Sequence, residues 1–103
     1  MKTGSSTLME KKPRTRTRRA PRWQVIGLND DVTPMDYVVL LLIEVFNKDQ
    51  EAAFRLMLEV HETGAGIFYV GTMEACELKV EQTQEMNRKY ERKLMVRMEP
   101  IED

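Results

Sequence analysis

Several residue types that other classes of protein depend on are scarce in this chain of 103 residues. The single cysteine, Cys76, excludes an intramolecular disulfide and a cysteine-rich zinc site, and it is typical of a reducing, cytoplasmic setting. The longest apolar run, from Tyr37 to Ile43, is far shorter than the roughly 20 residues of a membrane-spanning helix. The sequence has no phosphate-binding glycine loop, no zinc-protease motif and no serine after Ser6. We therefore expect no membrane span, no metal or cofactor, and no enzymatic activity.

The charged residues divide the chain into two parts. Residues 1–22 contain eight basic residues and one acidic residue, a net charge of +7, whereas residues 23–103 contain eight basic and sixteen acidic residues, a net charge of −8. The first part has few apolar side chains to bury, so we expect a disordered basic arm over residues 1–22 and one folded domain over residues 23–103. A basic arm can bind nucleic acid, but no aromatic side chain that could stack on bases precedes Trp23. We favour a solvated tether over a nucleic-acid contact.

The apolar pattern and the turn residues predict three strands and three helices. In chain order, the expected elements are a strand over 23–28, a helix over 34–46, a helix from Asp49 to about Glu62, a strand over 67–70, a helix that begins after Thr72, and a strand over 94–98. Thr33 is expected to cap the first helix, with Pro34 as its first residue. Gly64 and Gly66 are expected to end the second helix. The order β-α-α-β-α-β predicts an α+β fold, with a three-stranded antiparallel sheet packed against three helices.

Polar and apolar residues near the first two helices form a candidate binding site. The polar segment 29–31, Asn-Asp-Asp, lies immediately before the first predicted helix. Met57, Val60 and His61 have i, i+3 and i+4 spacing, so they share one face of the second helix. If the two helices form a hairpin, these residues enclose an apolar pocket with a polar, acidic rim. Such a rim suits a cation joined to an apolar group, and an α-amino group is one example because it donates three hydrogen bonds to oxygen or imidazole acceptors.

Each of these features also has a purely structural interpretation. An Asn-Asp-Asp segment before a helix is commonly an Asx turn, with its acids near the positive end of the helix dipole. A stripe of Met and Val is more often part of the core than the wall of a pocket. A histidine near the end of a helix commonly caps the last carbonyls. Spacing alone favours these structural interpretations.

Two segments together favour the binding-site interpretation over the structural one. Residues 28–35 read LNDDVTPM and are followed by an apolar helix, and residues 56–61 read LMLEVH and are followed by Gly64. In this combination the chain resembles the ClpS family of adaptors, which deliver N-degron substrates to an AAA+ Clp protease. The resemblance covers residues 23–99 and implies a fold similar to the C-terminal domain of the ribosomal stalk protein. It implies a cytoplasmic, non-enzymatic adaptor that binds proteins with N-terminal Phe, Tyr, Trp or Leu.

The resemblance also implies roles for individual residues. Three residues match positions that hold the free α-amino group of the substrate, a set that we call the amine clamp: Asn29, Asp30 and His61. Seven further residues match positions that line the pocket for the substrate's first side chain: Asp31, Thr33, Met35, Val38, Met57, Val60 and Leu94. In the family, the residue at the position of Met35 excludes β-branched side chains.

The resemblance further implies a partner surface on the third helix. Glu74 and Lys79 match positions that contact the N-terminal domain of a ClpA- or ClpC-type unfoldase. The basic arm coincides with an extension that the family uses in handing over cargo, although its strong basicity departs from the family pattern. An alternative function is therefore a basic-armed module that binds nucleic acid or the ribosome. We expect a monomer whose ligands are the N-terminal segments of other proteins.

Overall fold

The structure, a computed structural model, describes residues 20–102 of the chain. Its elements are β1 (Trp23–Leu28), α1 (Met35–Glu44), α2 (Gln50–Thr63), β2 (Ala65–Gly71), α3 (Met73–Tyr90) and β3 (Val96–Pro100). The predicted α+β class and the order β-α-α-β-α-β are confirmed. The predicted disordered arm falls almost entirely on residues 1–19, which lie outside the described residues.

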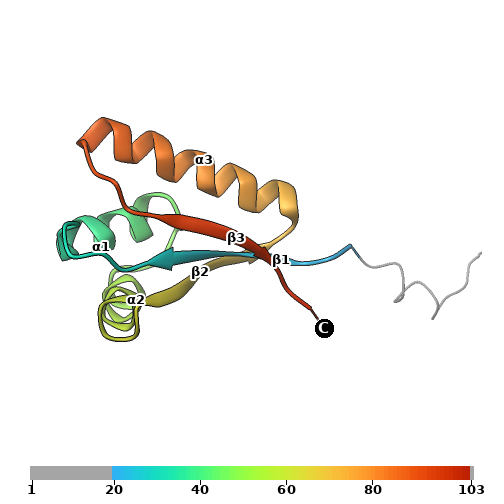
Figure 1. The fold of residues 1–103 in the computed structure, drawn as a ribbon, viewed down its shortest axis with the longest axis horizontal. Helices are drawn as coiled ribbons and strands as arrows, with labels where there is room; N and C mark the ends of the chain where they lie inside the picture. The colour runs from blue at the N-terminus through green and yellow to red at the C-terminus, as the bar shows by residue number, and fades with distance from the viewer. Residues whose placement is uncertain (1–19, 103) are drawn as a thin grey trace, which may run out of the picture.

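A three-stranded antiparallel sheet organises the fold. Strand β1 lies in the centre and pairs with β2 on one side and β3 on the other. Helix α3 runs along one face of the sheet, whereas α1 and α2 gather at the end where β1 finishes and β2 begins (Figure 1). Within the described residues, no helix is both long and apolar enough to cross a membrane.

A bulge in β2 decides which of its side chains enter the core. Val25 pairs with Tyr69 but the next residue, Ile26, pairs with Ile67, so Phe68 is an extra residue in the ladder. A bulge of this kind turns consecutive side chains toward the same face of the sheet. Phe68 is fully buried and Tyr69 packs against the core, while Ile67 remains half exposed on the opposite face.

The start of α1 differs from the sequence prediction. The helix begins at Met35, and Pro34 occupies the N-cap position with an extended backbone at φ −64° and ψ 145°. Thr33 was expected to cap the helix, but no side chain caps it, and the Thr33 hydroxyl instead donates a hydrogen bond to Asp30. The Pro34 carbonyl accepts hydrogen bonds from the N–H groups of Tyr37 at 3.2 Å and Val38 at 3.3 Å, so the helix starts after Pro34 and Thr33 belongs to the loop.

The end of α1 and the start of β3 also shift relative to the predicted boundaries. Helix α1 ends at Glu44, and the next two residues, Val45 and Phe46, turn away with their side chains buried in the core. Strand β3 begins at Val96 because its ladder with β1 starts at the pair Gly27–Val96. Leu94 was predicted to lie in this strand, but it belongs to the segment that leads into it.

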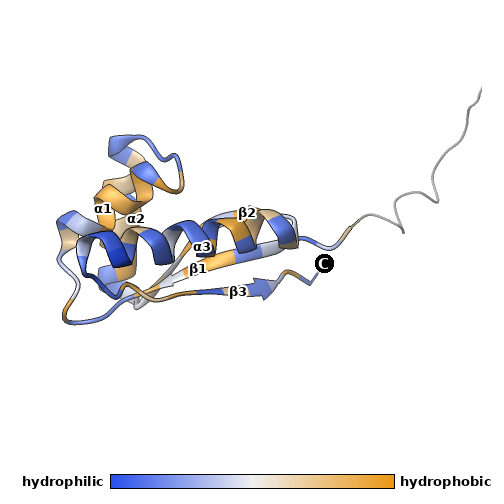
Figure 2. Cartoon of the chain, turned by 90° about the horizontal axis from the view of Figure 1, so that it is seen from above, coloured by the Kyte–Doolittle hydropathy of each residue, from blue (hydrophilic) through white to orange (hydrophobic). Residues whose placement is uncertain are grey.

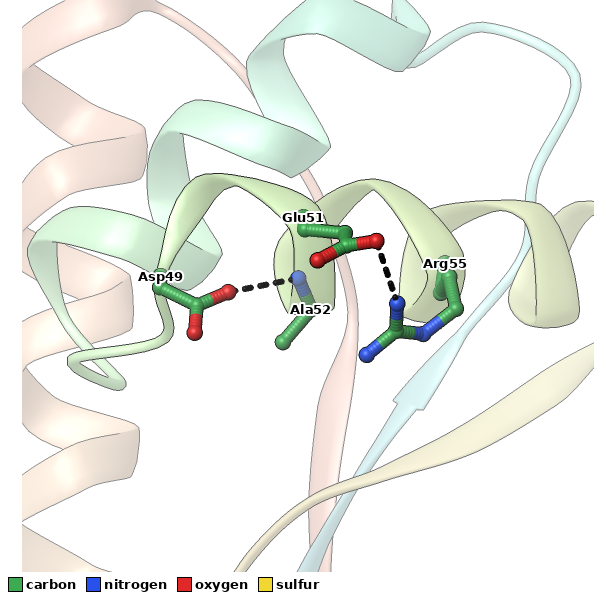
Figure 3. A network of polar contacts seen from close by, with 4 residues as sticks. All are labelled: Asp49, Glu51, Ala52 and Arg55. Carbon is green, nitrogen blue, oxygen red and sulfur yellow. Dashed lines mark hydrogen bonds and ion pairs between the residues drawn. The ribbon is translucent and has the colours of Figure 1, made fainter.

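The predicted caps of the other two helices are confirmed. Asp49 accepts a hydrogen bond from the Ala52 N–H at 2.7 Å, as Figure 3 shows together with the exposed Arg55–Glu51 ion pair. Thr72 caps α3 in the same way, by accepting from the Ala75 N–H at 3.1 Å. Side chains that satisfy the first free N–H groups of a helix stabilise its start by about 1 kcal/mol each.

Gly64 and Gly66, which were both predicted to end α2, have different roles. Gly64 ends α2 in the left-handed conformation, with φ +97°, as predicted. Gly66 was also expected to terminate α2, but it lies inside β2. A Cβ at Gly66 would approach the Val60 side chain to 2.9 Å, so close packing of β2 on α2 requires a glycine there.

The core lies between α3, the sheet and the α1–α2 pair. Its fully buried side chains include Leu41 and Leu42 of α1 and Cys76 of α3, and burial raises the pKa of the Cys76 thiol. Figure 2 shows mainly hydrophobic residues on α1 and mainly hydrophilic residues on α3. Because it is fully buried, Cys76 is a core residue, as the sequence predicted.

We predict that Gly27→Ala destabilises the fold through overpacking. A methyl group at Gly27 would overlap the ring of Phe68, which is fully buried and meets Phe46 edge to face at 5.2 Å between ring centroids. Because the ring has no free space, the cost is about 1–3 kcal/mol in the free energy of unfolding, measurable by urea denaturation. Gln24→Ala, on the same strand, is the control. Equal stability of the two variants would contradict this account of the core.

Candidate functional site

A cavity of about 340 Å³ opens beside the loop that follows β1, at the end of the sheet where α1 and α2 gather. Its lining consists of Leu28, Asn29, Asp30, Asp31, Val32, Thr33, Pro34, Met35, Val38, Met57, Val60, His61 and Leu94. All ten residues that the sequence analysis assigned to the amine clamp and the side-chain pocket lie in this lining. The sequence analysis missed Leu28, Val32 and Pro34, although all three belong to the same 28–35 motif.

Two main-chain hydrogen bonds at the end of β1 bring these residues together. The Asn29 N–H donates to the carbonyl of Gly64, and the Leu28 N–H donates to the carbonyl of Met95, both at 3.0 Å. The first bond places the loop after β1 against the end of α2, which carries His61. The second places the same loop beside the segment that carries Leu94.

Asp30 holds the loop in shape. Its Oδ1 accepts hydrogen bonds from the N–H groups of Val32 at 2.8 Å and Thr33 at 2.6 Å, and its Oδ2 accepts from the Thr33 hydroxyl at 2.8 Å. Burial alone would raise the pKa of the Asp30 carboxyl, but the hydrogen bonds from Thr33 and Val32 outweigh it, so the pKa is lowered from 3.8. The structural interpretation of this segment as an Asx turn is therefore right for Asp30.

The other polar side chains on the rim have no such partners. Within residues 20–102, the side chains of Asn29, Asp31 and His61 make no hydrogen bond or ion pair, and all three residues are exposed. The interpretation of His61 as a helix cap is therefore wrong. An amide oxygen, a carboxylate and the free nitrogen of a neutral imidazole are acceptors, so the rim offers several places for a donor group.

The wall of the cavity is apolar and continuous with the core. Its deep residues, each no more than 7% exposed, are Val38, Met57, Val60 and Leu94. Met35 is 44% exposed and therefore lies at the mouth. The Met/Val stripe thus serves both as core and as pocket wall, because these side chains pack inward on one side and line the cavity on the other.

The charge of the lining is negative. Asp30 and Asp31 belong to it, and no lysine or arginine among residues 20–102 does. In a concave site, charges of one sign reinforce one another and attract ions of the opposite sign. Among the described residues, no cluster of three or more His, Cys, Asp or Glu side chains could hold a metal ion. The arrangement favours an organic cation with an apolar substituent.

The two residues predicted to contact an unfoldase lie on α3, away from the cavity. Glu74 is exposed in the first turn of the helix. The Lys79 Nζ donates to the carbonyl of Val45 at 2.6 Å and lies 6.0 Å and 5.5 Å from the ring centroids of Phe46 and Tyr69. Five residues along an α-helix correspond to a rotation of about 500°, which is about 140° more than one full turn, so the two side chains leave the helix in different directions.

Comparisons with known proteins agree on one family. A family model described as "ATP-dependent Clp protease adaptor protein ClpS" matches residues 18–97. The Clp protease adapter ClpS of Caulobacter vibrioides (strain NA1000 / CB15N) is 43% identical over 96 residues, which cover 93% of this chain and 86% of that protein. ClpS 1 of Agrobacterium fabrum is 42% identical over 96 residues, which cover 93% and 80%. The structure of Agrobacterium tumefaciens ClpS2 bound to L-phenylalaninamide matches with a TM-score of 0.76 at 28% identity, over 81% of this chain and all of that one.

We predict that Asp30→Ala destabilises the protein by about 1–3 kcal/mol near neutral pH, because three donors lose a charged acceptor. Folding lowers the pKa of Asp30, so the contribution of its charge is present above 3.8 and is lost as the pH falls through the lower folded value. Urea denaturation at several pH values measures this, and the gap between wild type and variant should narrow in acid. Asp31→Ala, which removes no hydrogen bond within residues 20–102, is the control; an equal loss of stability there would contradict the role of Asp30.

Proposed function

Because this chain belongs to the ClpS family of Clp protease adaptors, we propose that its cavity binds the N-terminal residue of proteins that begin with Phe, Tyr, Trp or Leu. The bound protein is then delivered to a Clp unfoldase for degradation. In this proposal the chain acts as an adaptor and makes or breaks no covalent bond itself.

One observation carries the proposal: a single cavity combines an apolar interior with a negative rim on which the side chains of Asn29, Asp31 and His61 have no partner among the described residues. L-phenylalaninamide, the ligand in the ClpS2 structure, has an α-amino group, a benzyl side chain and a carboxamide. The N-terminal Phe of a polypeptide presents the same three groups. The chemistry of this lining suits that ligand, with the amine at the rim and the benzyl group inside.

The α-amino group would be held at the rim by Asn29 and His61. The two side chains come from different elements, the loop after β1 and the end of α2, and the Asn29–Gly64 hydrogen bond keeps these elements together. Hydrogen bonds that involve a charged group contribute about 1.5–3 kcal/mol each. Asp30 contributes its negative charge and the shape of the loop, since most of its acceptor capacity is already used.

The interior of the cavity would hold the first side chain of the substrate. Burial of an aromatic side chain removes about 150–250 Å² from water, which corresponds to roughly 4–6 kcal/mol before the costs of association. The walls that make this contact are largely buried before any ligand binds, so little ordering of the protein is needed. The remaining assigned residues, Asp31 and Thr33, lie on the loop beside this interior.

Selection for a chain terminus follows from the charge of the amine. An internal residue presents a neutral amide with one donor, whereas an N-terminal residue presents an ammonium group with three. Capture of an N-terminal amine next to an apolar anchor is a recurring mode of peptide recognition. A bound substrate is then held near the protease, which raises its local concentration there.

Contact with the unfoldase would use α3, through Glu74 and Lys79. Glu74 is exposed, and Lys79 retains two N–H donors after its bond to Val45. Because α3 contributes no residue to the lining of the cavity, substrate and unfoldase would bind separate surfaces and be held at the same time.

We predict that the protein binds a peptide that begins with Phe and that N-acetylation of this peptide abolishes binding. Acetylation removes the positive charge and two of the three donors while the benzyl group stays the same. Fluorescence anisotropy with a label at the peptide's C-terminus gives the Kd. His61→Ala should weaken binding of the free peptide about tenfold or more, and Glu62→Ala, an exposed neighbour outside the lining, should not. Equal affinity for the free and acetylated peptides would show that no amine clamp exists.

We also predict that Met35→Ala admits peptides that begin with Ile or Val. The Met35 side chain lies at the mouth of the cavity, and its removal makes room for a second branch at the Cβ atom of the ligand. The ratio of the Kd for an Ile peptide to that for a Leu peptide should fall by about tenfold. Leu78→Ala, which shortens a similarly exposed apolar side chain on α3, is the control. An unchanged ratio in Met35→Ala would place the gate elsewhere.

A further inference from the structure

One wall of the cavity is fixed by a helix that does not line it. Leu94 is 3% exposed and lies in the segment between α3 and β3, before the sheet pairing begins. Its carbonyl accepts a hydrogen bond from the Nδ2 of Asn87, in the last turns of α3, at 2.9 Å. Within residues 20–102, the main chain of Leu94 makes no other hydrogen bond. Asn87 therefore holds the Leu94 main chain from the side of α3, and the Leu28–Met95 hydrogen bond holds the next residue from the side of β1.

The other end of the Asn87 amide bonds to α1, which supplies another part of the lining. Its Oδ1 accepts a hydrogen bond from the Tyr37 hydroxyl at 2.7 Å. Tyr37 is 5% exposed and precedes Val38, which lines the cavity from α1. Burial raises the pKa of Tyr37, so the hydroxyl keeps the proton that it donates. The hydrogen bonds from Tyr37 to Asn87 and from Asn87 to Leu94 thus connect the two walls.

Further contacts stabilise the positions of Tyr37 and Asn87. The Asn87 carbonyl accepts from the Arg92 N–H at 2.8 Å, which closes the turn after α3. The Tyr37 and Tyr90 rings meet edge to face, with centroids 5.9 Å apart. The amide of Asn87 uses both its donor and its acceptor side, so an outward shift of Leu94 would leave a half-buried polar group without a partner, which is costly.

We propose that Asn87 is a positioning residue that sets the width of the cavity between Val38 and Leu94, and thereby limits the size of the N-terminal side chain that the cavity accepts. The inference rests on the proposed function, because it concerns selection among ligands of the same cavity. Asn87 touches no ligand itself. It acts through the Leu94 carbonyl on one side and through Tyr37 on the other.

Three peptides that differ only in their first residue, Leu, Phe or Trp, test this proposal against wild type and Asn87→Ala. Loss of the amide frees the Leu94 wall, so the affinity for the Trp peptide relative to the Leu peptide should rise by about threefold or more. The control is Thr83→Val, on the same helix. Thr83 is fully buried and loses one hydrogen bond, to the Lys79 carbonyl at 2.9 Å, but it lies outside the lining. A merely structural role would lower the unfolding temperature of both variants and leave the Trp-to-Leu ratio unchanged.

Tyr37→Phe provides a second and milder variant. It keeps the buried ring and removes only the hydroxyl, so it should shift the Trp-to-Leu ratio in the same direction by a smaller factor. The double variant Tyr37→Phe/Asn87→Ala should show the ratio of Asn87→Ala alone, because both changes break one chain of hydrogen bonds. Ratios equal to wild type in both single variants, with all three peptides still bound, would overturn the role of Asn87 but not the proposed function. Failure of the wild type to bind any of the peptides would overturn both.

Discussion

The site depends on the way the central strand ends. At Leu28 and Asn29, two consecutive N–H groups bond to carbonyls on opposite sides, one at the end of α2 and one before β3. These bonds continue the antiparallel ladders by one residue beyond the sheet. The loop after β1, the end of α2 and the segment before β3 are far apart in the sequence but meet here, and the cavity forms between them. The core packing of α1 and α2 against this point supplies the apolar wall.

The polar residues around this point divide the work between them. Asp30 accepts three hydrogen bonds and shapes the loop, whereas the side chains of Asn29 and His61 have no partner within residues 20–102. Asn87 has a similar structural role, because its amide accepts from the Tyr37 hydroxyl and donates to the Leu94 carbonyl. A pocket with preformed walls binds a ligand more tightly, because little free energy is lost in ordering the protein.

Three predictions that rest on the local chemistry of a single residue were confirmed. Asp49 and Thr72 cap their helices, and Gly64 ends α2 in the left-handed conformation. The prediction for Thr33 was wrong because Pro34, expected to be the first helical residue, itself has an extended backbone and takes the N-cap position. The prediction that Gly66 ends α2 was wrong for a different reason. A glycine is needed there because the Val60 side chain lies close by, a contact that no local pattern reveals.

The sequence by itself determined the type and order of the elements, because hydrophobic periodicity and capping act over a few residues. It also placed the candidate site, since its motifs carried a resemblance to a known family. Only the tertiary structure decided which polar side chains have hydrogen-bond partners within the described part of the chain: Asp30 has three, and His61 has none there. Hydrogen-bond partners and wall positions depend on distances between segments remote in the chain. Tyr37, Asn87 and Leu94 meet only because the fold brings them together.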